Sequence, residues 1–179
     1  MPVWDRLVRY LHWTLVASVL VAWVTIEVEG LIQPTVHEWA GYLALTVIVV
    51  RLWWGWRGPR YARFAQFVRS PGATLAYLRQ VAAHREPRHV GHNPLGGWMI
   101  VALLLCVVLT GASGWLYTTD RFWGLVWVEN LHDFFAHLLL ALAAVHVAGV
   151  LFSSFRHREN LAGAMLSGRK RAPQPDDVV

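Results

Sequence analysis

The sequence predicts an all-α integral membrane protein, a four-helix bundle with its N-terminus and its C-terminus both on the cytoplasmic side. The first observation is composition: 56% of the 179 residues are hydrophobic and 15% are charged, whereas soluble domains average about 45–50% and about 25%. The second is a set of four long apolar stretches, and the third is the clustering of Lys and Arg on one side of them. This composition argues against a disordered chain, a coiled coil and an ordinary soluble enzyme.

The four apolar stretches are the predicted membrane spans. A helix needs about 20 mostly apolar residues to cross a bilayer, and four segments reach that length: residues 7–26, 37–56, 95–117 and 131–155. The first lacks the A-x-A-like exit of a signal peptide, so we expect it to be retained. Residues 1–158 then form one membrane domain with a cytoplasmic loop at 57–94, and residues 159–179 form a cytoplasmic tail.

The basic residues set the orientation of the spans. The loop after the first span holds Glu27 and Glu29 but no Lys or Arg, and the loop after the third span holds only Arg121. All the other Lys and Arg residues of the sixteen lie on the opposite side, counting Arg51 near the inner end of the second span. By the positive-inside rule both termini are cytoplasmic. The net charge of +5 therefore indicates topology and not nucleic-acid binding, for which no recognition motif is present.

The cytoplasmic segments allow two interpretations of the loop and one of the tail. The loop at 57–94 alternates Arg with Phe, Leu and Val. We favour a positively charged loop whose Arg residues are attracted to anionic lipid; the alternative is a pair of short amphipathic helices lying in the interface. The terminal APQPDDVV predicts a frayed polar end.

The nine histidines divide by location. Four fall in cytoplasmic segments, where we expect solvated side chains: His84, His89, His92 and His157. Five fall in spans: His12, His37, His132, His137 and His146. Ionisable groups at membrane depth are costly and usually face the bundle interior for a functional reason.

Helix geometry pairs four of the five span histidines. His132 and His146 are 14 residues apart, about 40° short of four full turns, so they face nearly the same side with about 21 Å between them. His37 opens its span at the depth of His132, and His12 lies at a depth similar to His146. Two same-depth pairs follow, His37–His132 and His12–His146. His137 lies about 140° and 180° around the helix from its two neighbours, and we expect it to bond another helix or a lipid headgroup.

Four bundle-facing imidazoles at two depths indicate two haems, each held by two histidines. Zinc or copper transport calls for carboxylate or thiolate companions at each site, and the core offers essentially none. A proton relay calls for acids at the midplane, but the acids lie at the periphery. The lone Cys106 also excludes a disulfide framework and a CxxCH site for covalent haem.

Several further residues are candidates for supporting roles. Three glycines in the second and third spans can let a macrocycle and helix backbones approach closely: Gly41, Gly111 and Gly114. Arg9, one turn before His12, is a candidate for a haem propionate contact, with simple snorkelling as the alternative. Asp133 is either an orienting or proton-handling group or a helix-start carboxylate stabilised by the helix dipole.

The chain resembles the bacterial cytochrome b561 family, which is similar to the cytochrome b subunits of nickel–iron hydrogenases. The resemblance runs through WDRLVRYLHW, HEWAGY, GHNPLGGW, LHDFFAHLLLALAAVH and HRENLAGAMLSGRKR. It implies a four-helix bundle with two b-type haems stacked across a bacterial cytoplasmic membrane. By resemblance the iron ligands are His12, His37, His132 and His146.

The resemblance also implies a function. Family members exchange electrons with the quinone pool; some serve a dehydrogenase or a soluble cytochrome, and one type oxidises superoxide and reduces ubiquinone. We therefore expect a di-haem b-type cytochrome that passes electrons between quinone and a donor or acceptor on the outer side. The alternatives are a superoxide oxidase, a membrane anchor of a dehydrogenase or hydrogenase complex, and a haem-free transporter or sensor. No oligomeric state follows from the sequence.

Overall fold

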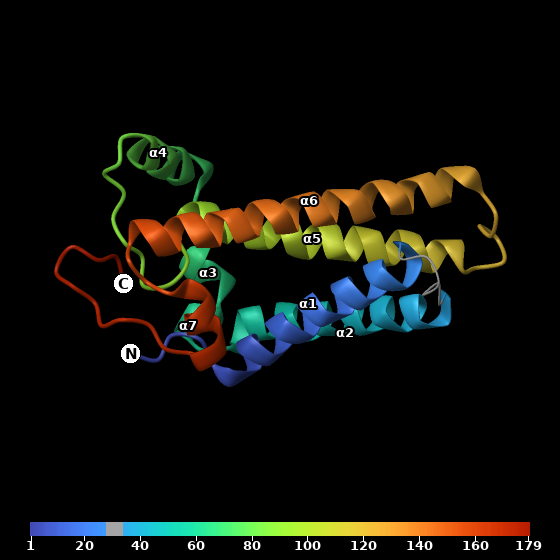
Figure 1. Cartoon of the computed structure of the whole chain (residues 1–179), viewed down its shortest axis with the longest axis horizontal. Coiled ribbons are helices and arrows are strands. Elements are labelled where there is room, and N and C mark those ends of the chain that lie inside the picture. The colour runs from blue at the N-terminus through green and yellow to red at the C-terminus, as the bar shows by residue number, and fades with distance from the viewer. Residues whose placement is uncertain (28–33) are drawn as a thin grey trace. The chain divides into compact units, whose positions relative to one another are not determined.

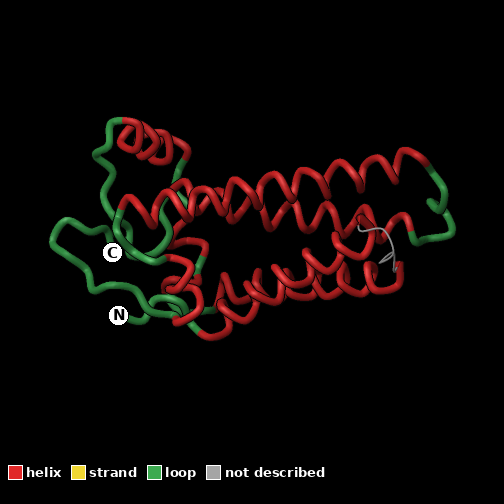
Figure 2. Tube along the Cα trace, in the orientation of Figure 1, coloured by secondary structure: helices red, strands yellow, loops and turns green. Residues whose placement is uncertain are grey.

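The computed structural model describes residues 1–27 and 34–179, and within these ranges the chain is built from seven α-helices and one short 3-10 helix, with no β-strand. Figure 1 labels the helices and Figure 2 shows the loops that join them. The helices are α1 (Arg6–Glu27), α2 (Pro34–Arg57), η1 (Arg60–Ala62), α3 (Phe64–Phe67), α4 (Pro71–Ala82), α5 (Pro94–Tyr117), α6 (Val126–Arg156) and α7 (Leu161–Ser167). The predicted all-α class is confirmed.

Three of the described helices are long and apolar enough to cross a membrane: α1, α5 and α6. Helix α2 is as long as α5, with 24 residues, but Arg51 and a group of tryptophans lower its hydropathy. Its crossing of the membrane stays a prediction. Glu27 ends α1, and Glu29, the other acid of the predicted outer loop, lies outside the described residues.

The start of α6 differs from its predicted position. The helix begins at Val126, five residues before the predicted span, because a helix can extend past the apolar segment that the bilayer requires. Glu129 occupies its first turn, where a carboxylate is favourable next to the helix dipole. Asp133 lies a further turn inside, so its interpretation as a helix-start carboxylate is wrong.

The loop at 57–94 contains short helices, as the alternative interpretation expected, whereas the attraction of its Arg residues to anionic lipid stays a prediction. It holds η1, α3 and α4. The oxygen of the Ser70 side chain accepts a hydrogen bond from the Ala73 backbone N at 3.3 Å, and Pro71 occupies the first turn. A serine cap followed by proline is a strong helix start.

The tail is also ordered, and the predicted frayed end is wrong. Asn160 caps α7 by accepting a hydrogen bond from Gly163 N at 2.7 Å, and Gly168 ends it with a φ of 79°. Further on, Val178 N donates to Arg88 O and Val178 O accepts from Val90 N, both at 2.9 Å. The end of the tail is therefore paired with the cytoplasmic loop.

The chain forms two compact units. Unit 1 comprises Met1–Arg9, Trp53–Ala102 and Ala143–Val179, and unit 2 comprises Tyr10–Leu52 and Leu103–Leu142. The core of unit 1 contains Val3, Trp4, Val90 and Ala164. In unit 2, residues of α2, α5 and α6 form the core and residues of α1 pack against it. These core residues are Ala44, Ile48, Cys106, Val107 and Leu139, with Leu15 and Val19 from α1.

Candidate functional site

The imidazole rings of His37 and His132 lie next to each other in unit 2. His37 comes from the first turn of α2 and His132 from the second turn of α6, and both are partly buried. Their ring centroids are 5.9 Å apart and the ring planes are inclined by 78°. These two residues were paired from helix spacing and depth, and the structure brings their rings together.

Hydrogen bonds fix which nitrogen of each ring carries the proton. His37 Nδ1 donates to the backbone oxygen of Ala22 at 2.8 Å, and His132 Nδ1 donates to that of Thr110 at 3.0 Å. A carbonyl oxygen can only accept, so the proton is on Nδ1 and Nε2 keeps its lone pair. Metal-ligating histidines commonly have this arrangement, since the bond to the second nitrogen orients the ring. Both rings are therefore prepared to ligate through Nε2.

The three small residues singled out from the sequence have different surroundings. A Cβ on Gly114 would lie 2.9 Å from His132 Cε1, so the glycine makes room for that ring. A Cβ on Gly111 would lie 2.6 Å from Leu45 Cδ2, which marks a close approach of α5 to α2. A Cβ on Gly41, one turn after His37, would meet no described atom within 4 Å. Of the three glycines, only Gly114 is thus packed against a ring of the histidine pair.

The residues of this pair fit a haem iron. Two metal–nitrogen bonds of about 2 Å, with about 1 Å from each nitrogen to its ring centre, place the two rings about 6 Å apart, close to the observed 5.9 Å. Among the described residues no group of three or more His, Cys, Asp or Glu could hold a metal ion. Two imidazoles without further protein ligands suit an iron whose other positions are filled by a porphyrin.

The second predicted pair is divided between the units. His12 lies on α1 in unit 2, and His146 lies on α6 in unit 1. Both side chains are partly buried. Their pairing stays a prediction.

Two other span residues have partners of a different kind. His137 is exposed, and its Nδ1 bonds the backbone oxygen of Asp133 in its own helix at 2.8 Å, not the separate helix expected from the sequence. Arg9 Nη2 donates to the backbone oxygen of Leu166 near the end of α7. Arg9 Nε is buried and has no hydrogen-bond partner among the described residues. The contact of Arg9 with a haem propionate stays a prediction.

Histidines outside the predicted spans are less solvated than expected. The ring of His89 packs edge-on against Tyr77 with centroids 5.2 Å apart. His92 lies against the rings of Trp4 and Phe67, at 4.5 Å and 4.7 Å. Burial lowers the pKa of His89 and of His157 below the ordinary value. The prediction of solvated side chains is wrong for His89 and His92, because nearby aromatic residues of unit 1 enclose them.

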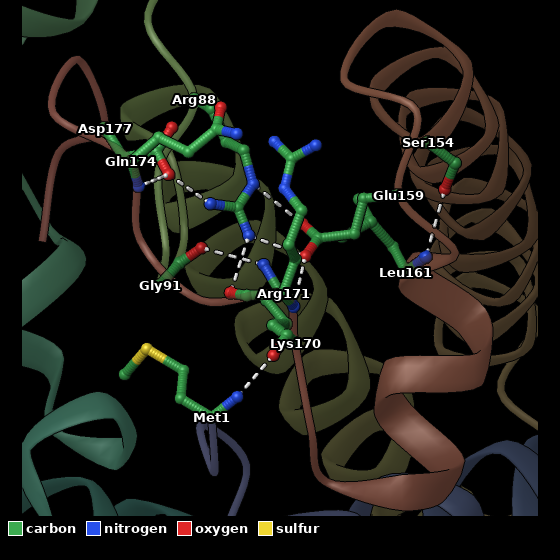
Figure 3. Close-up of polar contacts among 10 residues, drawn as sticks. All are labelled: Met1, Arg88, Gly91, Ser154, Glu159, Leu161, Lys170, Arg171, Gln174 and Asp177. Carbon is green, nitrogen blue, oxygen red and sulfur yellow. Dashed lines mark hydrogen bonds and ion pairs between the residues drawn. The ribbon is translucent and has the colours of Figure 1, made fainter.

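Sequence reasoning missed a buried ionic cluster in unit 1, drawn in Figure 3. Arg88 donates through Nη2 and Nε to the two carboxylate oxygens of Glu159, at 2.6 Å and 3.1 Å, and through Nη1 to Asp177. All three side chains are at most 7% exposed. Arg156 makes a second pair, its Nε lying 2.7 Å from Glu86 Oε1. Arg88 is thus tied to buried acids and is not a lipid-facing charge.

Comparison with known proteins assigns the chain to a family. The family model described as prokaryotic cytochrome b561 matches residues 3–168, which include every described helix and all five span histidines. Neither a curated protein nor a solved structure matches the chain. The matched range takes in both the histidine pair of unit 2 and the cytoplasmic loop. The chain therefore belongs to the prokaryotic cytochrome b561 family and is a membrane b-type cytochrome, a haem b protein of electron transport.

Proposed function

We propose that this cytochrome holds two haems in a four-helix bundle and passes electrons across the bacterial cytoplasmic membrane. One haem is ligated by His37 and His132 near the outer surface, and the other by His12 and His146 nearer the cytoplasm. The quinone pool is one redox partner, and a donor or acceptor on the outer side is the other. Any superoxide oxidation or service to a dehydrogenase would use this same pathway.

The observation that carries the proposal is the geometry of His37 and His132. The ring separation of 5.9 Å matches an iron between two imidazoles. Hydrogen bonds to the carbonyl groups of Ala22 and Thr110 leave Nε2 of both rings free of a proton. A structural histidine needs neither property, whereas an axial ligand benefits from both.

The route of the chain supports four crossings with both termini cytoplasmic. The chain leaves unit 1 along α1, returns along α2, leaves again along α5 and returns along α6. The two terminal segments are bonded to each other, with Val3 N donating to Gly168 O at 2.9 Å and Lys170 N to Met1 O at 2.9 Å. Termini on one side of a membrane require an even number of crossings, so this proposal has α2 cross together with the three more apolar helices.

The protein's residues position the carriers and exclude competing chemistry. Haem b supplies a one-electron carrier. If both imidazoles of a pair held the iron of one haem, they would disfavour oxygen binding there. Backbone carbonyls orient the rings of His37 and His132, and the apolar core around Ile48, Val107 and Leu139 keeps water away from that part of the bundle. Quinone chemistry then belongs at an exposed edge, where protons exchange with water.

Haem content tests the proposal. A pyridine-haemochrome assay on the purified protein should give about two b haems per chain, and His137→Ala should retain both because His137 is exposed and bonded within its own helix. A colourless protein would indicate the haem-free transporter instead. One haem, or loss of a haem in the His137 variant, would contradict the ligand assignment.

Stopped-flow absorbance tests the redox partners. When reduced protein is mixed with a short-chain ubiquinone, its haem absorbance should change to that of the oxidised form. When oxidised protein is mixed with superoxide, reduction of the haem would identify superoxide as an electron donor on the outer side. A reduced protein that no quinone oxidises in isolation would refute the quinone part of the proposal. It would favour a conduit that works only within a larger complex.

A further inference from the structure

Lys170 is the only lysine of the chain, and it is buried in unit 1 with 9% of its surface exposed. Its Nζ makes one long hydrogen bond, 3.4 Å to Gly91 O, and lies 5.3 Å from the centre of the Trp4 ring. Among the described residues no carboxylate lies within 4.0 Å of this ammonium group. Burial lowers the pKa of Lys170 to about 8. A buried cation without a paired anion is unfavourable unless something supplies the counter-charge.

A small cavity, the Lys170 chamber, adjoins this side chain. Its lining residues are Arg88, His89, Gly91, Asn93, Ser153, His157, Glu159, Leu161 and Lys170, all of them in unit 1. The chamber has a volume of about 40 Å³. A water needs roughly 10–15 Å³ of such volume, so the chamber has room for a few waters or for one carboxylate group. It is too small for the ring of a quinone.

The other ionisable groups that face the chamber are already satisfied. Glu159 Oε1 accepts from Arg88 Nη2 at 2.6 Å and from Arg171 N at 3.0 Å, and Oε2 accepts from Arg88 Nε at 3.1 Å. Arg88 also pairs with Asp177. Burial lowers the pKa of His89 and of His157, which disfavours the charged form of both rings. Figure 3 shows Lys170 near the Arg88–Glu159 pair, with its dashed bond to Gly91. Glu159 attracts Lys170 through space but is hydrogen-bonded to Arg88, so among the described residues no carboxylate is bonded to Lys170 in the chamber.

The position of the chamber on α6 connects it to His146. Ser153 and His157, two of its lining residues, follow His146 by 7 and 11 residues on the same helix. At about 100° per residue these spacings are within about 20° of whole turns, so the three side chains share one face. Ser153 lies about 10 Å along the helix axis from His146. The chamber is thus on the face of α6 that carries the proposed ligand, two turns toward the cytoplasmic end.

We propose that the Lys170 chamber binds a carboxylate and that this carboxylate is a propionate of the haem held by His146. The inference rests on the proposed role of His146 as an axial ligand. Lys170 supplies the counter-charge. Asn93 supplies an amide N–H₂, because its Oδ1 is occupied by Gly96 N at 2.7 Å, and the Ser153 hydroxyl supplies a further donor.

Lysine NMR tests the proposal, because a protein labelled with [ε-¹³C]lysine gives a single lysine signal. The pKa of Lys170 is measured from this signal in reduced, diamagnetic protein in phosphate-free buffer. A bound carboxylate favours the charged ammonium, so wild-type and His37→Ala protein should show a pKa at least one unit above that of His146→Ala. Equal values in all three, or a wild-type value that rises on adding phosphate, would overturn the proposal.

The haem content of the same samples distinguishes a failure of the His146 ligand assignment from a failure of the carboxylate site at Lys170. A His146→Ala protein that keeps both haems refutes the ligand assignment. A protein that loses one haem without a change in the Lys170 pKa refutes only the carboxylate site.

A second variant pair keeps the test independent of the folding of His146→Ala. Lys170→Gln removes the buried charge and Arg169→Gln removes the exposed charge next to it. A positive charge near a haem propionate favours the reduced state, so Lys170→Gln should shift the reduction equilibrium of one haem roughly tenfold toward the oxidised form, about 59 mV. Arg169→Gln should leave both potentials unchanged. Equal potentials in Lys170→Gln and wild-type protein with both haems bound would overturn the carboxylate site.

Discussion

Replacement of Gly114 by alanine tests the geometry of the histidine pair. A Cβ at this position would lie 2.9 Å from His132 Cε1 and 3.1 Å from His132 Nδ1. Carbon atoms in favourable contact are about 3.5–4.0 Å apart, so the ring must move by roughly 0.6 Å or more. That movement strains the 3.0 Å hydrogen bond from His132 Nδ1 to Thr110 O and displaces Nε2 from the ring of His37.

The expected effect is mainly on haem binding. Overpacking costs about 1–3 kcal/mol, whereas Gly→Ala in a helix returns about 1 kcal/mol, so the free energy of unfolding falls by about 0–2 kcal/mol. Disturbance of an orienting hydrogen bond weakens metal binding about 10–100-fold. Gly114→Ala should therefore fold and lose affinity for one of the two proposed haems by that factor.

The assay is haem titration of the apo-protein, followed by the Soret absorbance per chain. Gly149→Ala is the matched control, because a Cβ on that α6 glycine meets no described atom within 4 Å. The control should bind both haems as wild type does. A Gly114→Ala protein with wild-type affinity for both haems would refute the reasoning that His132 is packed as a ligand.

Unit 1 yields three further predictions, two on its ionic cluster and one on the end of α7. Arg88→Met strands two buried carboxylates, Glu159 and Asp177, and should destabilise unit 1 by about 3 kcal/mol; exposed Arg85→Met, the control, should change the thermal midpoint little. Burial raises the pKa of Glu159 and of Asp177, but hydrogen bonds, including those from Arg88, lower both by more than burial raises them. The pKa of Glu159 therefore lies below the ordinary 4.5 and that of Asp177 below the ordinary 3.8. Because these folded-state pKa values are depressed, tail docking should be intact above about pH 4.5 and be lost as the pH falls below these values, measured by protease cleavage of the tail; a tail equally resistant at pH 3 would contradict this. Gly168→Ala forces alanine into a φ of 79° and should lower stability by at least about 1 kcal/mol in thermal unfolding.

The apolar pattern predicted the long helices because membrane spans require continuous runs of apolar residues. It predicted both ends of α1 to within a residue, but it placed the start of α6 five residues late, since Val126 to Asn130 belong to the helix without being needed to cross the bilayer. Helix α4 carried a readable signal in Ser70 and Pro71 that charge patterning obscured. The docking of the tail had no local signal, because Arg88 and Asp177 are 89 residues apart in the chain.

The candidate site also contains some features that the sequence predicted and others that it did not. Helix period and depth were enough to predict that His37 and His132 meet. The groups that orient their rings were not predictable, because Ala22 and Thr110 contribute backbone oxygens that are independent of side-chain identity. The isolated ammonium of Lys170 was equally hidden, since its burial depends on segments from three parts of the sequence.

Haem counting in two double variants tests the central claim, that the four histidines act as two same-depth pairs. His37→Ala/His132→Ala removes both ligands of one proposed haem, whereas His37→Ala/His146→Ala removes one ligand from each. The account predicts about one b haem per chain in the first variant, the same as in either single variant, and none in the second. Loss of both haems from the first variant, or retention of one in the second, would contradict the account.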